Sequence, residues 1–282
     1  MGSGVWTTAS YTTSIASKGF ASADAVVYAD VQEVYRAHRL DPLLDPKNVI
    51  RECLDTEEHP ETIPVILALD VTGSMGHAAT TCAGKLDEIM TELYSKVKDV
   101  EFLMMGIGDL AYDDAPIQAS QFESDVRILD QTTKIYFEGG GGGNTFESYT
   151  AAWYFGLHHT KLDCWKRGKK GIIITLGDEP LNPYLPGGRL AQVLGGNSQD
   201  VDTDALYQQV TEKFDVYHIA ITDESSYGHY ETQIEKTWGK LLKDHFIIAT
   251  SNALPAVIGK IVASQNETTT TTINVTDEGI SW

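Results

Sequence analysis

From residue 61 onward, short apolar runs alternate with segments of helical periodicity. The runs carry little polar alternation, as expected of strands buried on both faces, and lie at 63–69, 100–107, 171–176, 216–221 and 246–249. Apolar residues at three- and four-residue spacing predict helices over 83–97, 147–159, 204–214, 230–242 and 254–264. We also expect one or two strands within 126–137. The pattern predicts an α/β fold: a doubly wound, mostly parallel sheet with helices on both faces, a Rossmann-like three-layer sandwich.

Residues 1–60 do not follow this alternation. The Ser- and Thr-rich segment 1–23 suggests an irregular or extended lead-in, whereas apolar residues across 24–40 have the spacing of one amphipathic helix. Asp41-Pro42 would end that helix, because a residue before proline is disfavoured in the helical region. We therefore expect an N-terminal extension, 1–60, that packs on a domain spanning 61–264.

Three other segments break the pattern. Residues 109–124 and 181–202 are rich in turn-forming residues and are predicted to be long loops, which we expect to contact a partner. The tail 265–282 holds five consecutive threonines, which favour extended backbone over helix. Two readings of the tail are open: disorder, or a strand added to a partner.

Charge and composition narrow the function classes. The chain has 282 residues, with 21 Lys and Arg against 40 Asp and Glu, a formal net charge of −19. Nucleic-acid binding is not expected, because it depends mainly on basic side chains. The widely spaced cysteines Cys53, Cys82 and Cys164 suggest a reducing compartment rather than a disulfide framework. With neither a signal-peptide pattern nor a long apolar stretch, we expect a cytoplasmic protein that does not enter a membrane.

The strongest local motif is Asp70-Val-Thr-Gly-Ser-Met-Gly76, directly after the first buried strand. In a doubly wound sheet, ligands bind beyond the carboxyl ends of the strands. That edge would receive the carboxylate of Asp70 and the hydroxyls of Thr72 and Ser74. Thr145, after a run of five glycines, and Asp178, after the third buried strand, are placed to join them. Carboxylate and hydroxyl oxygens are the ligands that a hard cation such as Mg²⁺ prefers.

Together these residues resemble the von Willebrand factor A (vWA) family, whose metal-ion-dependent adhesion site (MIDAS) reads D-x-S-x-S, then Thr, then Asp. Asp70 and Ser74 match the first Asp and the second Ser, and Thr72 stands at the first Ser position, as in the D-x-T-G-S-M variant of bacterial and phage members. Thr145 and Asp178 match the later Thr and Asp. The resemblance covers residues 61–264 and implies Mg²⁺, or another divalent cation such as Mn²⁺, as cofactor.

The resemblance implies binding rather than catalysis: the metal keeps a coordination position for an Asp or Glu of a partner protein. It also makes an AAA+ ATPase a candidate partner, since many bacterial members of the family work beside one. The net charge of −19 predicts that association with an acidic partner is slow and sensitive to salt.

Several alternatives stand beside this prediction. The chain could be a structural subunit of a phage or bacterial assembly that uses 1–60 and 265–282 for contacts. It could be a Mg²⁺-dependent phosphoryl hydrolase, although a lysine and a second Asp expected near the nucleophile are missing. Asp70 and Ser74 could simply cap a helix. Glu147 and Glu179 are treated as solvated carboxylates, and His218, within a strand, as a core histidine.

Overall fold

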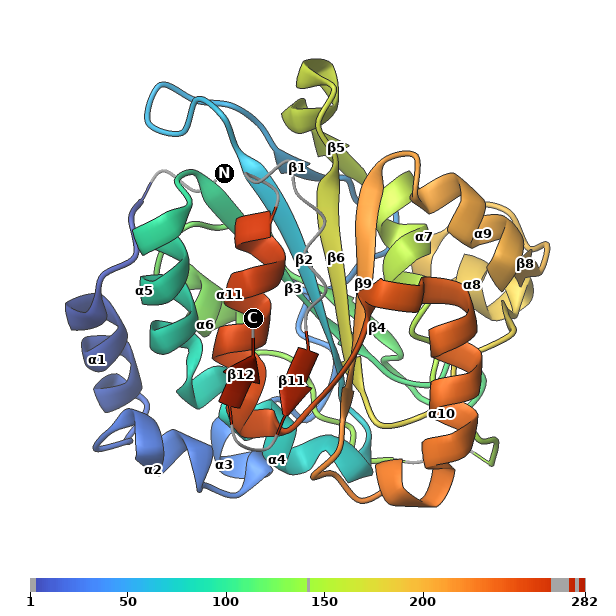
Figure 1. Ribbon diagram of the computed structural model, residues 1–282, viewed down its shortest axis with the longest axis horizontal. Helices are drawn as coiled ribbons and strands as arrows, with labels where there is room; N and C mark the ends of the chain where they lie inside the picture. Colours follow the sequence, from blue (N-terminus) through green and yellow to red (C-terminus); the bar gives the residue numbers. More distant parts are fainter. Residues whose placement is uncertain (1–3, 141–142, 265–273, 277–278, 282) are drawn as a thin grey trace.

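A six-stranded sheet forms the centre of the molecule (Figure 1). The structure is a computed structural model that describes residues 4–140, 143–264, 274–276 and 279–281. The strand order is β10-β9-β6-β2-β3-β4, with all pairs parallel except β3 with β4. The strands are β2 (Ile63–Asp70), β3 (Val100–Ile107), β4 (Ile117–Ala119), β6 (Gly171–Gly177), β9 (Phe214–Ile221) and β10 (Phe246–Ala249). The predicted doubly wound, mostly parallel α/β fold is confirmed.

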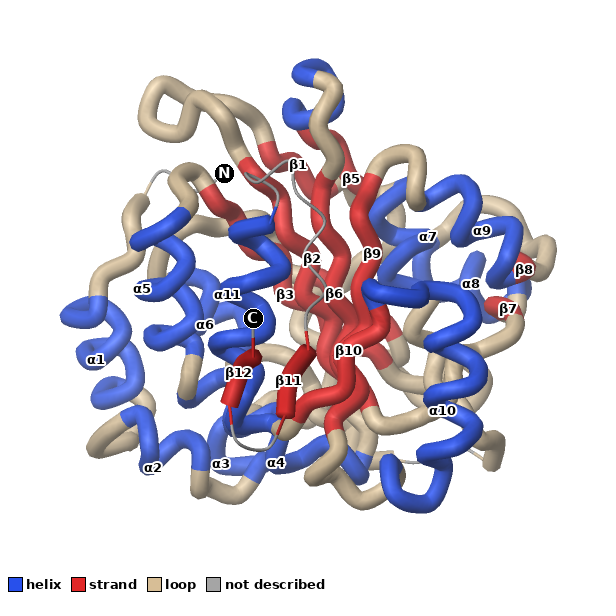
Figure 2. The backbone as a smooth tube through the Cα atoms, in the orientation of Figure 1, coloured by secondary structure: helices blue, strands red, loops and turns tan. Residues whose placement is uncertain are grey.

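Helices cover both faces of the sheet (Figure 2). One face is covered by α1 (Thr8–Ser17), α2 (Ala23–Val27), α3 (Val31–Val34), α4 (Gly76–Gly84), α5 (Leu86–Lys96), α6 (Arg127–Thr132) and α11 (Leu254–Ala263). The other is covered by α7 (Ala151–His158), α8 (Gly187–Leu194), α9 (Thr203–Val210) and α10 (Tyr227–Leu242). None of the helices in the described ranges is both long and apolar enough to span a bilayer.

The two faces explain why the strands lack polar alternation. In β2, Leu67 and Leu69 belong to the core on one side of the sheet, and Ile66 and Ala68 to the core on the other. Because successive side chains of a strand point to opposite faces, burial of both faces requires apolar residues at every position. The central strands therefore form at the positions that the apolar runs predict.

The first sixty residues contain more helix than the sequence predicts. The lead-in is helical at α1, where the Thr7 side chain accepts a hydrogen bond from the backbone N–H of Ser10. The single helix predicted over 24–40 is wrong: two short helices, α2 and α3, lie there, and Asp30 caps the second. Local capping thus ends one helix and begins the next, which apolar spacing alone does not reveal.

Three further predictions are corrected. Residues 126–137 hold the helix α6 rather than strands, and the Asp125 side chain accepts the N–H of Arg127 at its start. The predicted loop 109–124 contains the edge strand β4, and the predicted loop 181–202 contains α8 with β7 (Tyr184–Leu185) and β8 (Val201–Asp202). In each case a contact distant in sequence stabilises the segment, for example β4 against β3.

Besides the β7–β8 pair, two more two-stranded sheets of the described chain lie outside the central one. β1 (Arg51–Cys53) pairs in parallel with β5 (Thr160–Leu162), and β11 (Asn274–Thr276) pairs with β12 (Gly279–Ser281) in an antiparallel ribbon. The tail is therefore extended at these two strands, whereas the five threonines lie outside the described residues. The three cysteines are buried free thiols.

Candidate functional site

Asp70 and Asp178 meet at one edge of the sheet. Asp70 is the last residue of β2, and Asp178 follows β6, its neighbour. Because the two strands are parallel and Leu69 pairs with Leu176, the residues that follow emerge side by side. Both side chains are fully buried, so the fold places two carboxylates together away from solvent.

Two hydroxyls of the loop after β2 donate hydrogen bonds to these carboxylates. Thr72 donates to Oδ1 of Asp70 through its backbone N–H at 2.9 Å and through Oγ1 at 2.5 Å. Ser74 Oγ donates to Oδ1 of Asp178 at 2.9 Å. The backbone N–H of Ser226 donates to the other oxygen of Asp178 at 2.9 Å. Four of the predicted ligands are thus brought together.

The fifth, Thr145, is not joined to this group. Its side chain is exposed, and among the described residues no hydrogen bond links it to the other four. The glycine run that precedes it does reach the loop after β2: the N–H of Gly73 donates to the carbonyl oxygen of Gly140 at 3.0 Å. A Cβ at Gly73 would lie 2.9 Å from the carbonyl oxygen of Gly139. Glycine at position 73 therefore allows the two segments to approach.

Tyr149 is a member of the site that the sequence did not reveal. Its hydroxyl donates to Oδ2 of Asp70 at 2.6 Å, and its ring is fully buried. A Cβ at Gly177 would lie 2.2 Å from that hydroxyl, so only glycine fits beside it. The residue comes from the segment just before α7, and only the tertiary fold brings it to Asp70.

An aromatic cluster packs against the ring of Tyr149. The ring of Tyr149 packs edge-on against His218 and Trp238, with centroid distances of 5.3 and 5.7 Å. His218 is fully buried, stacks on Trp238 at 3.7 Å and contacts Oγ1 of Thr175 through Nδ1 at 2.8 Å. Burial lowers its pKa well below the usual value. The prediction of a core histidine is confirmed.

Further carboxylates surround the two aspartates. Glu147, expected to be solvated, is only 2% exposed, and its Oε2 has no hydrogen-bond partner among the described residues. Asp109, which follows β3, is also 2% exposed, and its Oδ2 likewise has no hydrogen-bond partner among the described residues. Glu179 has an unpartnered buried oxygen as well. The sequence interpretation of Glu147 as a solvated side chain is therefore wrong, whereas Glu179 is half-buried.

The carboxylates raise one another's pKa values. Burial, and then Asp178, raise the pKa of Asp70, whereas the hydrogen bonds from Thr72 and Tyr149 lower it. Burial and nearby Asp70, Glu179, Asp109 and Asp113 raise the pKa of Glu147. Burial with Asp70 and Asp178 raises the pKa of Glu179 to about 8. Each charged neighbour that raises these pKa values is another carboxylate, so the site concentrates negative charge.

The donor set is the kind that a hard divalent cation uses. Two buried carboxylates and two hydroxyls converge, and buried carboxylate oxygens beside them are unpartnered. Within the described ranges, no three His, Cys, Asp or Glu side chains are arranged to hold a metal ion by themselves. A cation here would therefore depend on the hydroxyls of Thr72 and Ser74 and on water, which suits an ion that keeps part of its hydration shell.

Comparison with known proteins gives structural matches only. No protein-family model and no curated protein sequence matches the chain. The pilus adhesin SpaC of Lactobacillus rhamnosus GG, in its open conformation, matches with a TM-score of 0.50 and 12% identity over 77% of this chain. This chain spans only 31% of that adhesin.

Two other solved structures have lower scores. The vWF domain of the pilus tip protein Mfa5 from Porphyromonas gingivalis has 12% identity and a TM-score of 0.46, covering 77% of this chain and 98% of that one. BatB from Bacteroides thetaiotaomicron has 12% identity and a TM-score of 0.40, covering 73% of this chain and all of that one. At such identities the similarity concerns the fold, a mostly parallel sheet covered by helices on both faces.

Proposed function

We propose that this chain is a vWA-type module that binds a partner protein through a divalent cation, Mg²⁺ or Mn²⁺. Asp70, Thr72, Ser74 and Asp178 would hold the cation, and Thr145 would join them through a rearrangement of its loop. The observation that carries the proposal is the convergence of two fully buried carboxylates with two hydroxyls at the carboxyl edge of the sheet.

Each residue has a distinct role in this proposal. When bound, the cation supplies a positive charge to which a partner's Asp or Glu can coordinate. Thr72 and Ser74 offer neutral oxygens, so the cation retains more of its charge than it would among carboxylates alone. Asp70 and Asp178 are fixed by bonds from Tyr149 and the backbone of Ser226. Preorganised ligands lower the entropic cost of binding.

The hydrolase alternative has less support. The motif that begins at Asp70 carries neither the lysine nor the second Asp expected beside the nucleophile of such a hydrolase. The scaffold alternative assigns contacts to residues 1–60 and 265–282, and within 1–60 the side chains of Trp6, Tyr11 and Ile15 are buried in the core and so are not available to a partner. An AAA+ ATPase stays a candidate partner through the family resemblance.

Thermal unfolding with Mg²⁺ and with EDTA tests the metal site. A ligand at a hundredfold excess over its dissociation constant stabilises the folded state by about 2.7 kcal/mol, which raises the Tm of a chain this size by about 5 °C. We expect this rise for the wild type and its loss in Asp70→Asn and Asp178→Asn. Asp244→Asn, which removes an exposed carboxylate on the η3 turn (Lys243–His245), should respond like the wild type.

Three results would count against the proposal. If Mg²⁺ and Mn²⁺ leave the wild-type Tm unchanged, these residues hold no metal in the isolated chain. If all three variants respond like the wild type, the metal binds elsewhere. Steady Mg²⁺-dependent turnover of an aryl phosphate that is lost in Asp70→Asn would favour the hydrolase instead.

A further inference from the structure

Acidic side chains at the metal-site edge have no basic partner. Within the described ranges, none of the ion pairs involves Asp109, Asp113, Asp114, Glu138, Glu179 or Glu224. Arg189 contacts the 109–115 loop, but it donates to the carbonyl oxygens of Leu110 and Asp113 rather than to a carboxylate. These carboxyl groups therefore have no basic side chain to pair with in the described chain.

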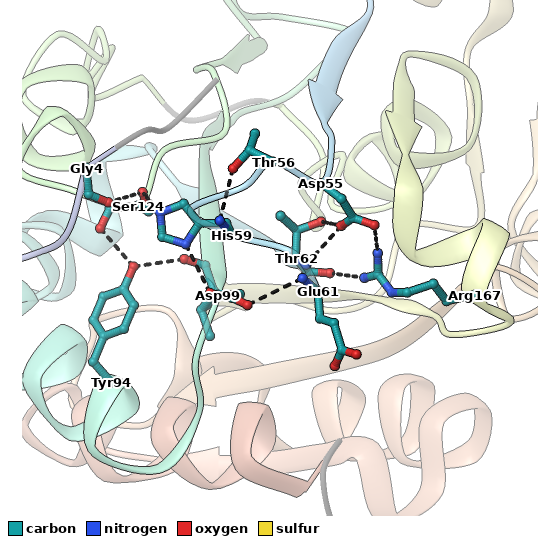
Figure 3. A network of polar contacts seen from close by, with 11 residues as sticks. Gly4, Asp55, Thr56, His59, Glu61, Thr62, Tyr94, Asp99, Ser124 and Arg167 are labelled. Carbon is teal, nitrogen blue, oxygen red and sulfur yellow. Dashed lines mark hydrogen bonds and ion pairs between the residues drawn. The ribbon is translucent and has the colours of Figure 1, made fainter.

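The opposite edge of the sheet is organised differently (Figure 3). There Asp55 pairs with Arg167, which also donates to the carbonyl oxygen of Thr62, and Asp99 contacts Nδ1 of His59 at 3.1 Å. Lys161 and Lys166 pair with acidic neighbours in the same region. Ion pairs thus occur at this end of the sheet, whereas in the described chain none involves the six carboxylates named above at the other end.

Buried carboxylate oxygens at this edge, on Asp109, Glu147 and Glu179, lack a hydrogen-bond partner in the described chain. Oε2 of Glu147 and Oδ2 of Asp109 belong to side chains that are 98% buried, and neither has a hydrogen-bond partner among the described residues. Glu147 lies near Asp70, Glu179 and Asp113. Buried polar groups without partners are uncommon in native proteins and indicate a missing ligand or donor.

The 109–115 loop adds an exposed aromatic side chain. Tyr112 is 59% exposed, and a Cβ at Gly143, in the glycine run, would lie 3.2 Å from its hydroxyl. The loop is held firmly: the Asp109 side chain accepts the N–H of Ala111 at 2.7 Å, and Asp113 accepts the N–H of Asp109 at 2.7 Å. Asp114 is exposed two residues after Tyr112, and its backbone N–H donates to Glu138. An exposed tyrosine ring and an exposed carboxylate in one loop can each attract a Lys or Arg side chain.

We propose that the partner segment carries Lys or Arg beside the carboxylate that reaches the cation, and that Tyr112 and Asp114 receive the basic side chain. The inference rests on the proposed function. A purely acidic segment would be attracted by the cation but repelled by the unpaired carboxylates around it. A segment that carries both an acidic and a basic side chain is complementary to the cation and to the carboxylates around it.

Three labelled peptides of equal length test the inference on the full chain in Mg²⁺, by fluorescence anisotropy up to millimolar concentration. One carries Lys-Asp-Lys, one Ser-Asp-Ser and one Lys-Ser-Lys, each in a Gly-Ser background. We expect Lys-Asp-Lys to bind most tightly and to lose binding in EDTA. Asp114→Lys should weaken it about fivefold, and Tyr112→Ala should also weaken it. Glu57→Lys, the same charge reversal at an exposed site in the loop leading into β2, should leave it unchanged.

The outcomes separate the inference from the proposed function. Equal Mg²⁺-dependent binding of Lys-Asp-Lys and Ser-Asp-Ser, unaffected by Asp114→Lys, would overturn the inference and leave the metal-dependent module standing. Equal binding of Lys-Ser-Lys and Lys-Asp-Lys without Mg²⁺ would support a basic partner. It would contradict the claim that a carboxylate of the partner coordinates the cation. Absence of binding by all three peptides would overturn both.

Discussion

The hydroxyl of Tyr149 donates a hydrogen bond of 2.6 Å to Oδ2 of Asp70, while Thr72 occupies Oδ1 of the same carboxylate. The carboxylate at the centre of the candidate metal site is thus held on both sides before any ligand arrives. One of these two contacts is local in sequence, and the other spans 79 residues.

Removal of the tyrosine hydroxyl should weaken metal binding. In Tyr149→Phe the ring remains, but Asp70 loses the donor that orients it. Substitution of groups that orient a metal ligand commonly costs 10- to 100-fold in affinity, and we expect about tenfold weaker binding of Mn²⁺ by calorimetry.

Tyr94→Phe is the matched control. The Tyr94 hydroxyl also donates to backbone carbonyls, those of Val100 and Ser124, but it lies at the opposite edge of the sheet (Figure 3). The Tyr94→Phe substitution should lower the Tm without changing the affinity for Mn²⁺. Equal Mn²⁺ affinities for Tyr149→Phe and the wild type would show that Tyr149 only fills space.

Gly177→Ala should displace Tyr149. The new Cβ would lie 2.2 Å from the tyrosine hydroxyl and 2.4 Å from two ring carbons, and the buried ring has little room to move. Overpacking of this kind costs about 1–3 kcal/mol, measured by urea unfolding, and should also reduce the Mg²⁺-induced rise in Tm. At Gly228, within α10, a Cβ meets open space, so Gly228→Ala should stabilise the chain by up to about 1 kcal/mol. Similar unfolding free energies for the two variants would contradict the packing argument.

Asp113 should make stability depend on pH. Burial, and then Glu138, Asp109 and Asp114, raise its pKa to about 6, so the folded state favours the neutral carboxyl. The contribution of the neutral Asp113 carboxyl to the free energy of unfolding is complete below the pKa of Asp in the unfolded chain, about 4. This contribution is lost as the pH rises through about 6.

Asp113→Asn keeps an oxygen that accepts the N–H of Asp109 and removes the titration. In EDTA, the Tm of Asp113→Asn relative to the wild type should rise by about 3 °C between pH 4 and pH 6.5, and then stay level. Asp244→Asn, at an exposed position, should show no such trend. A difference between Asp113→Asn and the wild type that stays constant with pH would contradict this assignment.

Trp6 should anchor the N-terminal residues to the core. It is 6% exposed, its indole N–H donates to Asp87 at 2.7 Å, and its ring packs against Tyr11 with centroids 5.8 Å apart. Trp6→Ala should lower the free energy of unfolding by about 3 kcal/mol in urea. Val5→Ala, at the adjacent exposed residue, should change it by less than about 0.5 kcal/mol. A small effect of Trp6→Ala would mean that this segment contributes little to stability.

The sequence by itself determined five of the six strands of the central sheet. The apolar runs that became β2, β3, β6 and β9 are buried on both faces, and this burial requires the nearly uninterrupted hydrophobicity by which they were recognised, whereas β10 is a short apolar strand at the edge of the sheet. Asp70 and Asp178 follow two of these strands directly, so strand position and the parallel arrangement were sufficient to bring them to one edge. Thr72 and Ser74 are within four residues of Asp70, and their placement is local.

Tertiary structure decided what depends on contacts distant in sequence. The short edge strand β4 forms because β3 offers it hydrogen bonds. α6 replaces a predicted strand because the hydrogen bond from the N–H of Arg127 to Asp125 and the burial of Ile128 and Leu129 favour a helix. Tyr149 at Asp70, and the burial of Glu147 among other carboxylates, likewise arise only when separate segments meet. The sequence pattern predicts interactions between residues that are close along the chain. The burial of a side chain and its contacts with distant residues depend on how the whole chain packs.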